Sequence, residues 1–398
     1  MNDLQIRLHF LSIPFKLTFT HSQAKRSDCD SIIVEVNDGT HRGFGEAILR
    51  EYVNGPDAIV SDPGAAGDRM RAIFETFGGS SGAGGGRAAG SGGPSSPDGI
   101  GMQTLRKVLL NTPWKNGDLP LVSAAEAAVL DLLCKRENRD IYALLDIQPR
   151  RETLTYGGVL PILSKEAIRV MLERYMKHGI RYIRLKLSQS IDHNRSILPL
   201  VRTIVGEEFD VRVDVNCAWS VDDAVAHLDL LQENGIRLVE EPLGPDRAGM
   251  FELNKQAATR GISFVADESA VSFQDVDAII GDGSFSMLNI RLAKNGGILR
   301  SLAIAEKAAA AGLRYQLGAH VGETGISSVT GRIAASLMSD PVYIDGSFDE
   351  YILADNITAR SYSFGIGGEA KIIRNEGIGY EVDPEKLEKY SLSSHIIL

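Results

Sequence analysis

Three carboxylates recur at nearly equal spacing in the middle of the chain. Asp214, Glu240 and Asp267 each follow a short apolar run, and they are separated by 26 and 27 residues. One strand–helix unit of a parallel barrel needs about that length, so three consecutive strands could aim one carboxylate each at a common point. Such an oxygen-only site suits Mg²⁺, with Mn²⁺ as an alternative. Strand alternation alone does not decide between Glu240 and its neighbour Glu241, and we choose Glu240.

Two basic residues accompany these acids. Lys186 ends a preceding apolar run two residues after Arg184, so both side chains face the same side of a strand. The neighbouring guanidinium disfavours the ammonium form and lowers the lysine pKa, which makes Lys186 a candidate base near neutral pH. Arg291 ends a later run, across the predicted barrel from Lys186. Because arginine stays protonated, it suits a carboxylate clamp or a charge stabiliser better than a proton acceptor.

Five further polar residues are candidate substrate contacts. Asn216 lies two residues beyond the first carboxylate and points the same way, so it could contact that carboxylate or the substrate. His320 and Glu323 end the seventh predicted strand and Asp345 ends the eighth, and all three are candidates for specificity or proton relay. Lys294 precedes a Gly-Gly pair, which favours a turn position over a catalytic one.

The elements that must position these residues follow a regular strand–helix rhythm from Leu154 onward. Several of the intervening segments carry apolar stripes at helical spacing. Eight strands of this kind predict an α/β barrel with chemistry at the carboxyl ends of its strands. The predicted strands are Leu154–Ile162, Tyr182–Leu187, Val211–Asn216, Leu238–Pro242, Ser263–Glu268, Ser286–Leu292, Tyr315–Val321 and Val342–Ser347.

The N-terminal part has a different pattern. Its alternating apolar residues and an Asp-Gly pair predict a three-stranded antiparallel sheet, and the polar stretch Phe15–Asp30 is predicted to be a long loop with a possible functional role. Ser123 is predicted to cap a helix over Ala124–Arg136, with Glu126 completing a capping box. The predicted strands are Leu4–Leu11, Ser31–Val36 and Gly43–Ala47, and further helices are predicted near Asp62–Phe77 and Met102–Leu110.

Length and composition predict three parts. The 398 residues divide into an N-terminal α+β domain over 1–120, containing a flexible glycine-rich loop at 78–101, a barrel over 121–347 and a C-terminal segment over 348–398 that returns to the first domain. The net charge of −10 argues against nucleic acid or an anionic membrane as partner. Three scattered cysteines and the lack of a long apolar run favour a cytoplasmic protein.

Taken together, the motifs resemble the enolase superfamily, and within it the muconate lactonizing enzyme subgroup of the mandelate racemase/muconate lactonizing enzyme family. VDVNCAW, VEEP and VADES resemble the three strand ends that bind metal, and RLK stands where the subgroup has a K-x-K pair. The resemblance implies a modified (β/α)7β barrel capped by an α+β domain, Mg²⁺ bound by Asp214, Glu240 and Asp267, and Lys186 as acid/base catalyst. It also implies a small-molecule carboxylate substrate, closure of the cap loops over that substrate, and a homo-oligomer.

The chain departs from the family pattern at three positions. Arg184 replaces the first lysine of the pair and keeps its charge. Arg291, within NIRLAKNGG, stands where the family has a lysine, and deprotonating an arginine costs roughly 1.4 kcal/mol per pKa unit above the working pH. The eighth strand has only Asp345, where dipeptide epimerases carry a D-x-D that holds the substrate ammonium.

These features predict an enzyme that removes the proton α to a carboxylate through a metal-stabilised ene-diolate, the general chemistry of enolase-superfamily sites. One-base elimination or cycloisomerisation with Lys186 as the base is the preferred outcome. Racemisation or epimerisation of an amino-acid or dipeptide derivative, with Lys294 or Arg291 serving the opposite face, is the first alternative. A non-catalytic carboxylate-binding protein of the same fold is the second.

Overall fold

The computed structural model describes residues 4–58, 62–78, 100–375 and 377–398. The predicted glycine-rich loop at 78–101 lies outside these ranges apart from its ends. No helix within these ranges has both the length and the apolar character that crossing a membrane requires.

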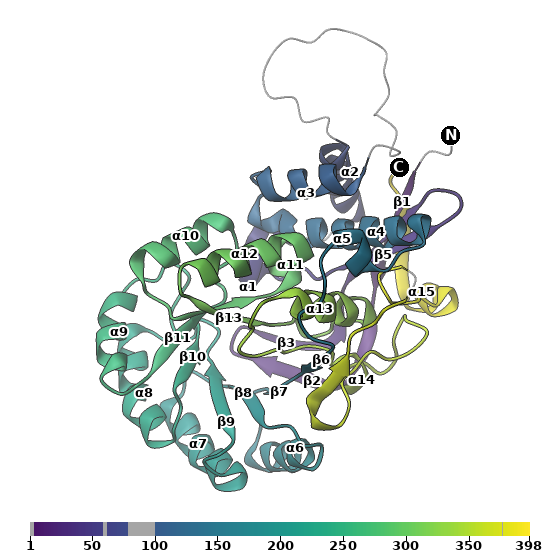
Figure 1. Ribbon diagram of the computed structural model, residues 1–398. Helices are drawn as coiled ribbons and strands as arrows, with labels where there is room; N and C mark the ends of the chain where they lie inside the picture. The colour runs from purple at the N-terminus through teal and green to yellow at the C-terminus, as the bar shows by residue number, and fades with distance from the viewer. Residues whose placement is uncertain (1–3, 59–61, 79–99, 376) are drawn as a thin grey trace.

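A curled parallel sheet of seven strands dominates the molecule (Figure 1). Its strands lie in the order β13-β12-β11-β10-β9-β8-β7, so neighbours in sequence are neighbours in space. The runs are short and rich in buried Val, Ile and Leu, as expected of strands covered on both faces. The strands are β7 (Gly158–Leu160), β8 (Tyr182–Lys186), β9 (Asp210–Asp214), β10 (Leu238–Glu240), β11 (Ser263–Ala266), β12 (Met287–Ile290) and β13 (Arg314–Leu317).

An irregular segment closes this sheet into a barrel. The Leu317 amide donates to the Tyr343 carbonyl at 3.0 Å and the Asp345 amide to the Leu317 carbonyl at 2.8 Å, while the Gly157 amide donates to the Ile344 carbonyl at 3.0 Å. The predicted (β/α)7β barrel is therefore confirmed. The prediction of a regular eighth strand over Val342–Ser347 is wrong, because this segment makes only an isolated bridge.

The predicted first barrel strand, Leu154–Ile162, is also divided. Its beginning forms β6 (Thr153–Thr155), which pairs with β14 (Glu369–Lys371) outside the barrel, and only β7 enters the parallel sheet. Helices surround the barrel on the outside (Figure 1). They are α6 (Lys165–Lys177), α7 (Ile191–Val205), α8 (Val221–Glu233), α9 (Met250–Ala258), α10 (Phe273–Asp282), α11 (Leu292–Asn295), α12 (Ile298–Ala310) and α13 (Gly325–Leu337).

The N-terminal part forms an antiparallel sheet in the order β15-β1-β4-β5. Its strands are β1 (Gln5–Leu11), β4 (Ile32–Asn37), β5 (Arg42–Ala47) and, from the other end of the chain, β15 (Ser391–Ile396). The helices α2 (Pro63–Phe77), α3 (Met102–Asn111), α4 (Leu119–Glu137) and α5 (Ile141–Leu145) follow, with short α1 (Glu51–Asn54) before them. A Cβ atom at Gly43 or Gly45 would overlap backbone atoms of α4, so these glycines let the helix lie directly on β5.

The predicted loop Phe15–Asp30 is instead a β-hairpin, and the loop prediction is wrong. Strands β2 (Ile13–His21) and β3 (Ala24–Cys29) pair with each other across a turn at Ser22-Gln23. The hairpin is joined to the barrel by hydrogen bonds from the Ser22 hydroxyl to the Val215 carbonyl at 2.9 Å and from the Ile162 amide to the Thr20 carbonyl at 3.1 Å. It thus lies against the end of the barrel where β9 finishes.

The predicted capping box at Ser123 is wrong as well. Helix α4 begins at Leu119, four residues earlier, with Pro120 in its first turn, a position where the missing N–H of proline costs nothing. Ser123 therefore lies inside a buried helix. Glu126 does cap a helix, but the helix is α12: its carboxylate accepts the amides of Ile298 and Leu299, the latter at 2.9 Å.

Candidate active site

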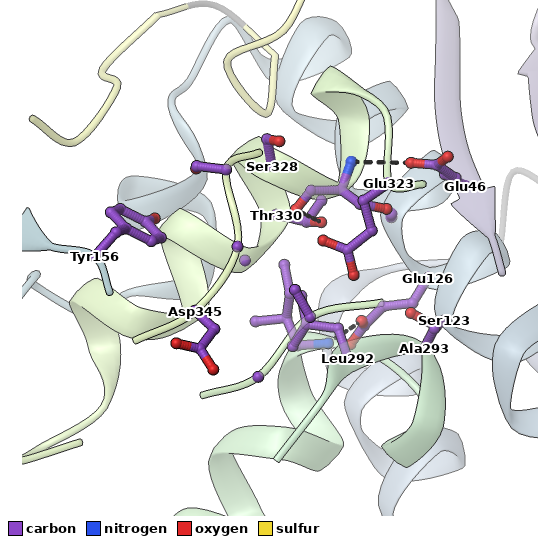
Figure 2. Close-up of a pocket in the computed structure, with 18 residues that line it drawn as sticks. Glu46, Ser123, Glu126, Tyr156, Leu292, Ala293, Glu323, Ser328, Thr330 and Asp345 are labelled. Atoms are coloured by element: carbon purple, nitrogen blue, oxygen red, sulfur yellow. Dashed lines mark hydrogen bonds between the residues drawn. The ribbon is translucent and has the colours of Figure 1, made fainter. Parts of the chain in front are cut away.

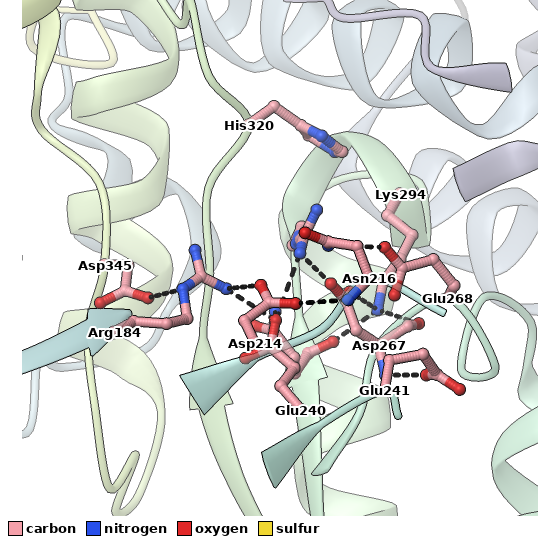
Figure 3. Close-up of polar contacts among 12 residues, drawn as sticks. Arg184, Asp214, Asn216, Glu240, Glu241, Asp267, Glu268, Lys294, His320 and Asp345 are labelled. Carbon is pink, nitrogen blue, oxygen red and sulfur yellow. Dashed lines mark hydrogen bonds and ion pairs between the residues drawn. The ribbon is translucent and has the colours of Figure 1, made fainter. Parts of the chain in front are cut away.

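The predicted catalytic and metal-binding side chains meet at the carboxyl ends of strands β8 to β12 (Figure 3). Lys186 is in register with Asp214, and Asp214 with Glu240, on three adjacent parallel strands. All three side chains are buried. The spacing that the sequence shows between strand ends therefore corresponds to side-by-side positions in the barrel.

Lys186 is held by two acceptors from the end of β9. Its amine donates to Asp214 Oδ2 at 2.6 Å and to Asn216 Oδ1 at 2.7 Å. The Asn216 backbone is left-handed with φ 49°, a conformation that asparagine tolerates, and its amide donates to Asp214 Oδ1 at 3.0 Å. The turn after β9 thus fixes the acid and the amide on either side of the lysine.

Burial lowers the pKa of the Lys186 ammonium. The carboxylate of Asp214 opposes this shift, and the guanidinium groups of Arg184 and Arg291 add to it. The lysine is therefore closer to deprotonation at neutral pH than an exposed lysine is.

Glu240 is the most heavily hydrogen-bonded of the three predicted metal ligands. Its Oε1 accepts from Arg184 Nη1 at 2.7 Å and from Asn289 Nδ2 at 2.9 Å, and Arg291 Nη2 lies 3.4 Å away. Its Oε2 accepts from Gln316 Nε2 at 2.8 Å. Although burial opposes it, Arg184 and Arg291 hold the pKa of Glu240 far below its ordinary value, so this carboxylate is ionised.

Asp267 is bound by two cations on its other side. Arg291 Nη2 contacts its Oδ2, and the Lys294 amine lies 3.0 Å from its Oδ1. Lys294 is fully buried and also donates to the carbonyls of Asp267 and Asn289, at 2.8 and 2.5 Å. Burial lowers the pKa of Lys294 to about 7. Its bonding to two backbone carbonyls agrees with a turn-stabilising position.

Of the two neighbouring acids, Glu268 stays at this cluster, where its Oε1 accepts from Asn216 Nδ2 at 3.2 Å, and Glu241 turns away from it. Glu241, with φ 38°, turns to the outside of the strand end, where its Oε2 accepts the amides of Asp267 at 2.6 Å and Ser269 at 3.0 Å. Burial raises the pKa of Glu241 to about 7 and that of Glu268 to about 8. Glu240 and not Glu241 faces the interior, as we chose from the sequence, and Glu241 instead fixes the loop that carries Asp267.

A cavity of about 220 Å³ opens above the cluster. Its inner end is formed by Arg184, Lys186, Asn216, Arg291 and His320. One wall comes from the hairpin, with Leu17, Thr18 and Phe19. A second wall comes from β7, α6 and their loops, with Val159, Pro161, Leu163, Met171, Arg174, Tyr175, His178 and Ile180. The third comes from the short helix α14 (Asp349–Ile352) and residues near it, with Phe348, Tyr351, Ile352 and Phe364. Lys186 therefore faces the space in which a ligand would bind.

His320 is an unpaired polar group on this cavity. Its side chain is only 4% exposed, and neither ring nitrogen has a hydrogen-bond partner among the described residues. Burial, with Arg291 and Arg50 nearby, lowers the pKa of His320 well below its ordinary value, so the ring is neutral. A buried group without a partner is costly in an empty site, and a bound ligand could satisfy it.

Three of the predicted substrate contacts lie away from this cavity. Lys294 is enclosed behind Asp267. Asp345 lies beneath Arg184, with its Oδ2 2.6 Å from Arg212 Nη2 and 3.3 Å from Arg184 Nε. Glu323 borders a separate cavity of about 20 Å³, shared with Glu46 and Glu126, which has room for about one water molecule (Figure 2).

The carboxylates of Asp214, Glu240 and Asp267 can be compared with the oxygen ligands that a divalent cation requires. Arg184 Nη1 lies 3.4 Å from Asp214 Oδ2 and 2.7 Å from Glu240 Oε1, and Arg291 Nη2 bridges Glu240 and Asp267. Three buried carboxylates thus share two guanidinium groups, and their hard oxygen donors are of the type that Mg²⁺ prefers. As they stand, no three His, Cys, Asp or Glu residues of the described chain form a group able to hold a metal ion. The Arg291 guanidinium stands between the carboxylates of Glu240 and Asp267.

Several residues of the site were missed in the sequence. Asn289 and Gln316 both bind Glu240, and each is a buried polar residue inside a barrel strand. Asn289 precedes Arg291 by two residues, so strand alternation could have placed it on the same face. The cavity walls from the hairpin and α14 had no comparable signal, because they come from segments far apart in the chain.

Comparison with known proteins supports the predicted fold and family. Residues 167–386 match the family model described as enolase C-terminal domain-like. Chloromuconate cycloisomerase CbnB of Cupriavidus necator is 26% identical over 280 residues, covering 69% of this chain and 74% of the relative.

Two solved structures share the fold. The N-succinyl Arg/Lys racemase of Bacillus cereus has a TM-score of 0.83 at 20% identity, covering both chains completely. The dipeptide epimerase of Enterococcus faecalis, complexed with Mg and the dipeptide L-Leu-L-Tyr, has a TM-score of 0.76 at 20% identity over 96% of this chain and 100% of that one.

Proposed function

The chain belongs to the enolase C-terminal domain-like family, and from this membership in an enzyme superfamily we propose that it removes the proton α to the carboxylate of a small molecule, with Lys186 as the base. The observation that carries the proposal is the position of the Lys186 amine. It lines the cavity and has a lowered pKa, and it is oriented by Asp214 and Asn216.

The hydrogen bonds of Lys186 suit a proton acceptor. A neutral amine has two N–H groups and one lone pair. If the two N–H groups keep their bonds to Asp214 and Asn216, the lone pair is left to face the cavity. After the lysine takes a proton, the same two acceptors stabilise the ammonium.

The arginines of the inner wall supply the positive charge that a substrate carboxylate needs. Arg184 and Arg291 both line the cavity and both stay protonated, so they can bind a carboxylate and stabilise negative charge that develops beside it. Binding in this pocket also orients the α-carbon toward Lys186 and keeps water away from it.

We further propose that Asp214, Glu240 and Asp267 would hold Mg²⁺. Enolase-superfamily enzymes depend on a metal ion, and the dipeptide epimerase of Enterococcus faecalis is complexed with Mg. When bound, the ion would supply positive charge to the substrate carboxylate and lower the cost of ionising the adjacent C–H bond.

One-base elimination or cycloisomerisation is the outcome that the residues favour. The group opposite Lys186 is Arg291, whose guanidinium is engaged by Glu240 and Asp267 and is a poor proton donor–acceptor. Racemisation remains the second candidate, because Arg291 and the neutral His320 also line the cavity and could serve the other face of the substrate.

Proton exchange tests the proposal. A panel of carboxylates is incubated with the protein and MgCl₂ in D₂O, and deuterium at the α-carbon is followed by NMR. We expect exchange or turnover with the wild type and a loss of at least a thousandfold in Lys186→Met, because no other lysine of the described residues lines this cavity. The matched control is Lys255→Met, which changes an exposed lysine on α9 and should exchange at the wild-type rate.

Each result bears on the mechanism. Unchanged exchange in Lys186→Met would contradict the assignment of the base. Interconversion of stereoisomers with deuterium incorporation would replace the one-base outcome by racemisation. Binding of carboxylates without any exchange across the panel would indicate a binding protein.

A further inference from the structure

We propose that the cavity selects a carboxylate whose body is apolar and which carries no ammonium group. This inference names the substrate class of the proposed function and rests on that function for the role of the inner wall. It comes from four features of the cavity: the charge of its lining, the state of Asp345, the residues of its walls and the unpaired His320.

The charged side chains that line the cavity are basic. Arg184, Lys186 and Arg291 stand at the inner end and Arg174 stands in the wall, whereas none of the described residues that line the cavity is Asp or Glu. The carboxylates of Asp214, Glu240 and Asp267 are already paired with the arginines and the lysine. A ligand anion therefore meets cations at the cavity surface, and a ligand ammonium would meet no carboxylate among the described residues that line it.

Asp345 stands where the resemblance to dipeptide epimerases implies an acid for the substrate ammonium, and one of its two oxygens is already engaged. Its Oδ2 lies 2.6 Å from Arg212 Nη2 and 3.3 Å from Arg184 Nε, and the guanidinium of Arg212 lies against the ring of Tyr343. Both Asp345 and Arg212 are nearly inaccessible. Withdrawing Oδ2 from Arg212 would leave that buried guanidinium without the one acidic partner it has among the described residues, which is costly.

The walls are apolar over most of the cavity. Leu17 and Phe19 come from the hairpin, Leu163 and Met171 from the barrel, and Phe348 with Phe364 from the C-terminal part. Tyr351 and the 78% exposed Leu17 extend this surface to the outside. An apolar ligand body that covers these side chains gains free energy by leaving water, whereas a polar body would lose its hydration.

His320 provides the neutral polar contact in this setting. Its ring is uncharged and has one donor and one acceptor nitrogen, both without partners within the described chain. Because it lies at the inner end, it can hydrogen-bond a carbonyl or hydroxyl group next to the carboxylate. A neutral imidazole among arginines offers no counter-charge to an ammonium.

Calorimetric binding with matched ligands tests the inference on the full-length protein in MgCl₂. The probes are 3-phenylpropanoate, L-phenylalanine, which adds only an α-ammonium, and propanoate, which lacks the ring. We expect 3-phenylpropanoate to bind at least tenfold tighter than either. Leu17→Ala should weaken 3-phenylpropanoate by about threefold, and Phe251→Ala, which truncates an exposed side chain on α9, should leave its affinity unchanged.

Binding of L-phenylalanine as tight as that of 3-phenylpropanoate would overturn the exclusion of an ammonium. Binding of propanoate as tight as that of 3-phenylpropanoate would overturn the proposed preference for an apolar ligand body. An equal effect of Leu17→Ala and Phe251→Ala would overturn it as well. The measurement needs no turnover. If the selectivity is found but no carboxylate exchanges its α-proton, the inference stands and the proposed function fails. Faster α-proton exchange with amino acids than with carboxylates that lack an ammonium group would support the proposed function and refute the proposed exclusion of an ammonium.

Discussion

Arg291 is the residue at which this site departs most from the pattern it resembles. Its guanidinium bridges Glu240 and Asp267, so a tethered cation stands among the oxygens proposed to hold Mg²⁺. Two cations a few ångströms apart in a buried site repel each other by several kcal/mol. If Mg²⁺ binds there as proposed, Arg291 and the ion compete for the same carboxylates, and metal binding displaces the arginine.

This competition predicts the behaviour of Arg291→Met. Without metal the variant should lose roughly 3 kcal/mol of unfolding free energy, because two buried carboxylates lose a partner. Its affinity for Mg²⁺ should rise at least tenfold over that of the wild type, and Mg²⁺ should restore the lost stability. Calorimetry and thermal unfolding with and without MgCl₂ measure both effects.

The control for this prediction is Arg247→Met, which removes a surface arginine paired with Asp282 and should change neither quantity. Equal Mg²⁺ affinity in the wild type and Arg291→Met would show that the arginine does not compete. Failure of Mg²⁺ to stabilise Arg291→Met would place the metal elsewhere or remove it from the site.

At the scale of elements, α4 and α12 are joined by one buried carboxylate. Glu126, from α4, accepts the amides of Ile298 and Leu299 in the first turn of α12. Gly297, with φ 104°, leaves room for this carboxylate, which a Cβ atom would overlap. The contact fixes α4 against the barrel helix α12. Burial raises the pKa of Glu126 to about 7.

The raised pKa predicts a pH-dependent stability. In the unfolded chain Glu126 titrates near its ordinary value, so between about pH 4.5 and 7 the folded state binds the proton and the unfolded state does not. The contribution of protonated Glu126 to the unfolding free energy is therefore complete below about pH 4.5. It is lost as the pH rises through 7, and the total loss is on the order of 3 kcal/mol.

Glu126→Gln keeps the neutral shape and removes the titration. Its unfolding free energy relative to the wild type should increase from pH 5 to pH 8 in urea titrations. A difference that stays constant between these pH values would show that Glu126 is ionised in the folded state throughout the range. The exposed Glu166→Gln, on α6, serves as the control and should show no such trend.

The sequence predicted these elements unevenly, for physical reasons. Barrel strands and their terminal acids were found because each is a local apolar run with a charged end. The prediction that Glu126 completes the cap of its own helix is wrong, because its carboxylate accepts the first amides of α12, which lie 172 residues further along the chain. The hairpin was missed although Phe15, Leu17 and Phe19 alternate with polar residues, because its length and polarity resembled a loop.

At the scale of the whole molecule, the cavity exists only where three distant parts of the chain meet. The hairpin, the first strand–helix unit of the barrel and the segment around α14 each supply one wall. An isolated bridge between Phe15 and Leu353 and a hydrogen bond from the Ala354 amide to the Pro14 carbonyl at 2.8 Å join the first part to the last. Sequence patterns locate the catalytic residues at the strand ends, but the shape and polarity of the cavity depend on this long-range assembly.

The two ends of the chain are joined in a similar way, through β15 and β1. The Ile6 amide donates to the Leu398 carbonyl at 3.1 Å, the Ile397 amide donates to the Ile6 carbonyl at 2.9 Å, and Arg71 Nε donates to the Ile397 carbonyl at 2.8 Å. The Ile397 side chain is 8% exposed. The last strand is thus part of the N-terminal sheet, and the sheet is complete only when the final residues of the chain are in place.

Deleting residues 391–398 should therefore destabilise the protein by on the order of 5 kcal/mol, because several backbone hydrogen bonds and a buried isoleucine are lost. The uncovered edge of β1 should also promote self-association. Urea unfolding and light scattering measure the two effects. Leu392→Ala, which truncates a side chain that is 77% exposed but keeps the strand, is the control and should change the unfolding free energy by less than about 0.5 kcal/mol. A truncated chain that is as stable and as monodisperse as the control would show that β15 does not hold the N-terminal sheet together.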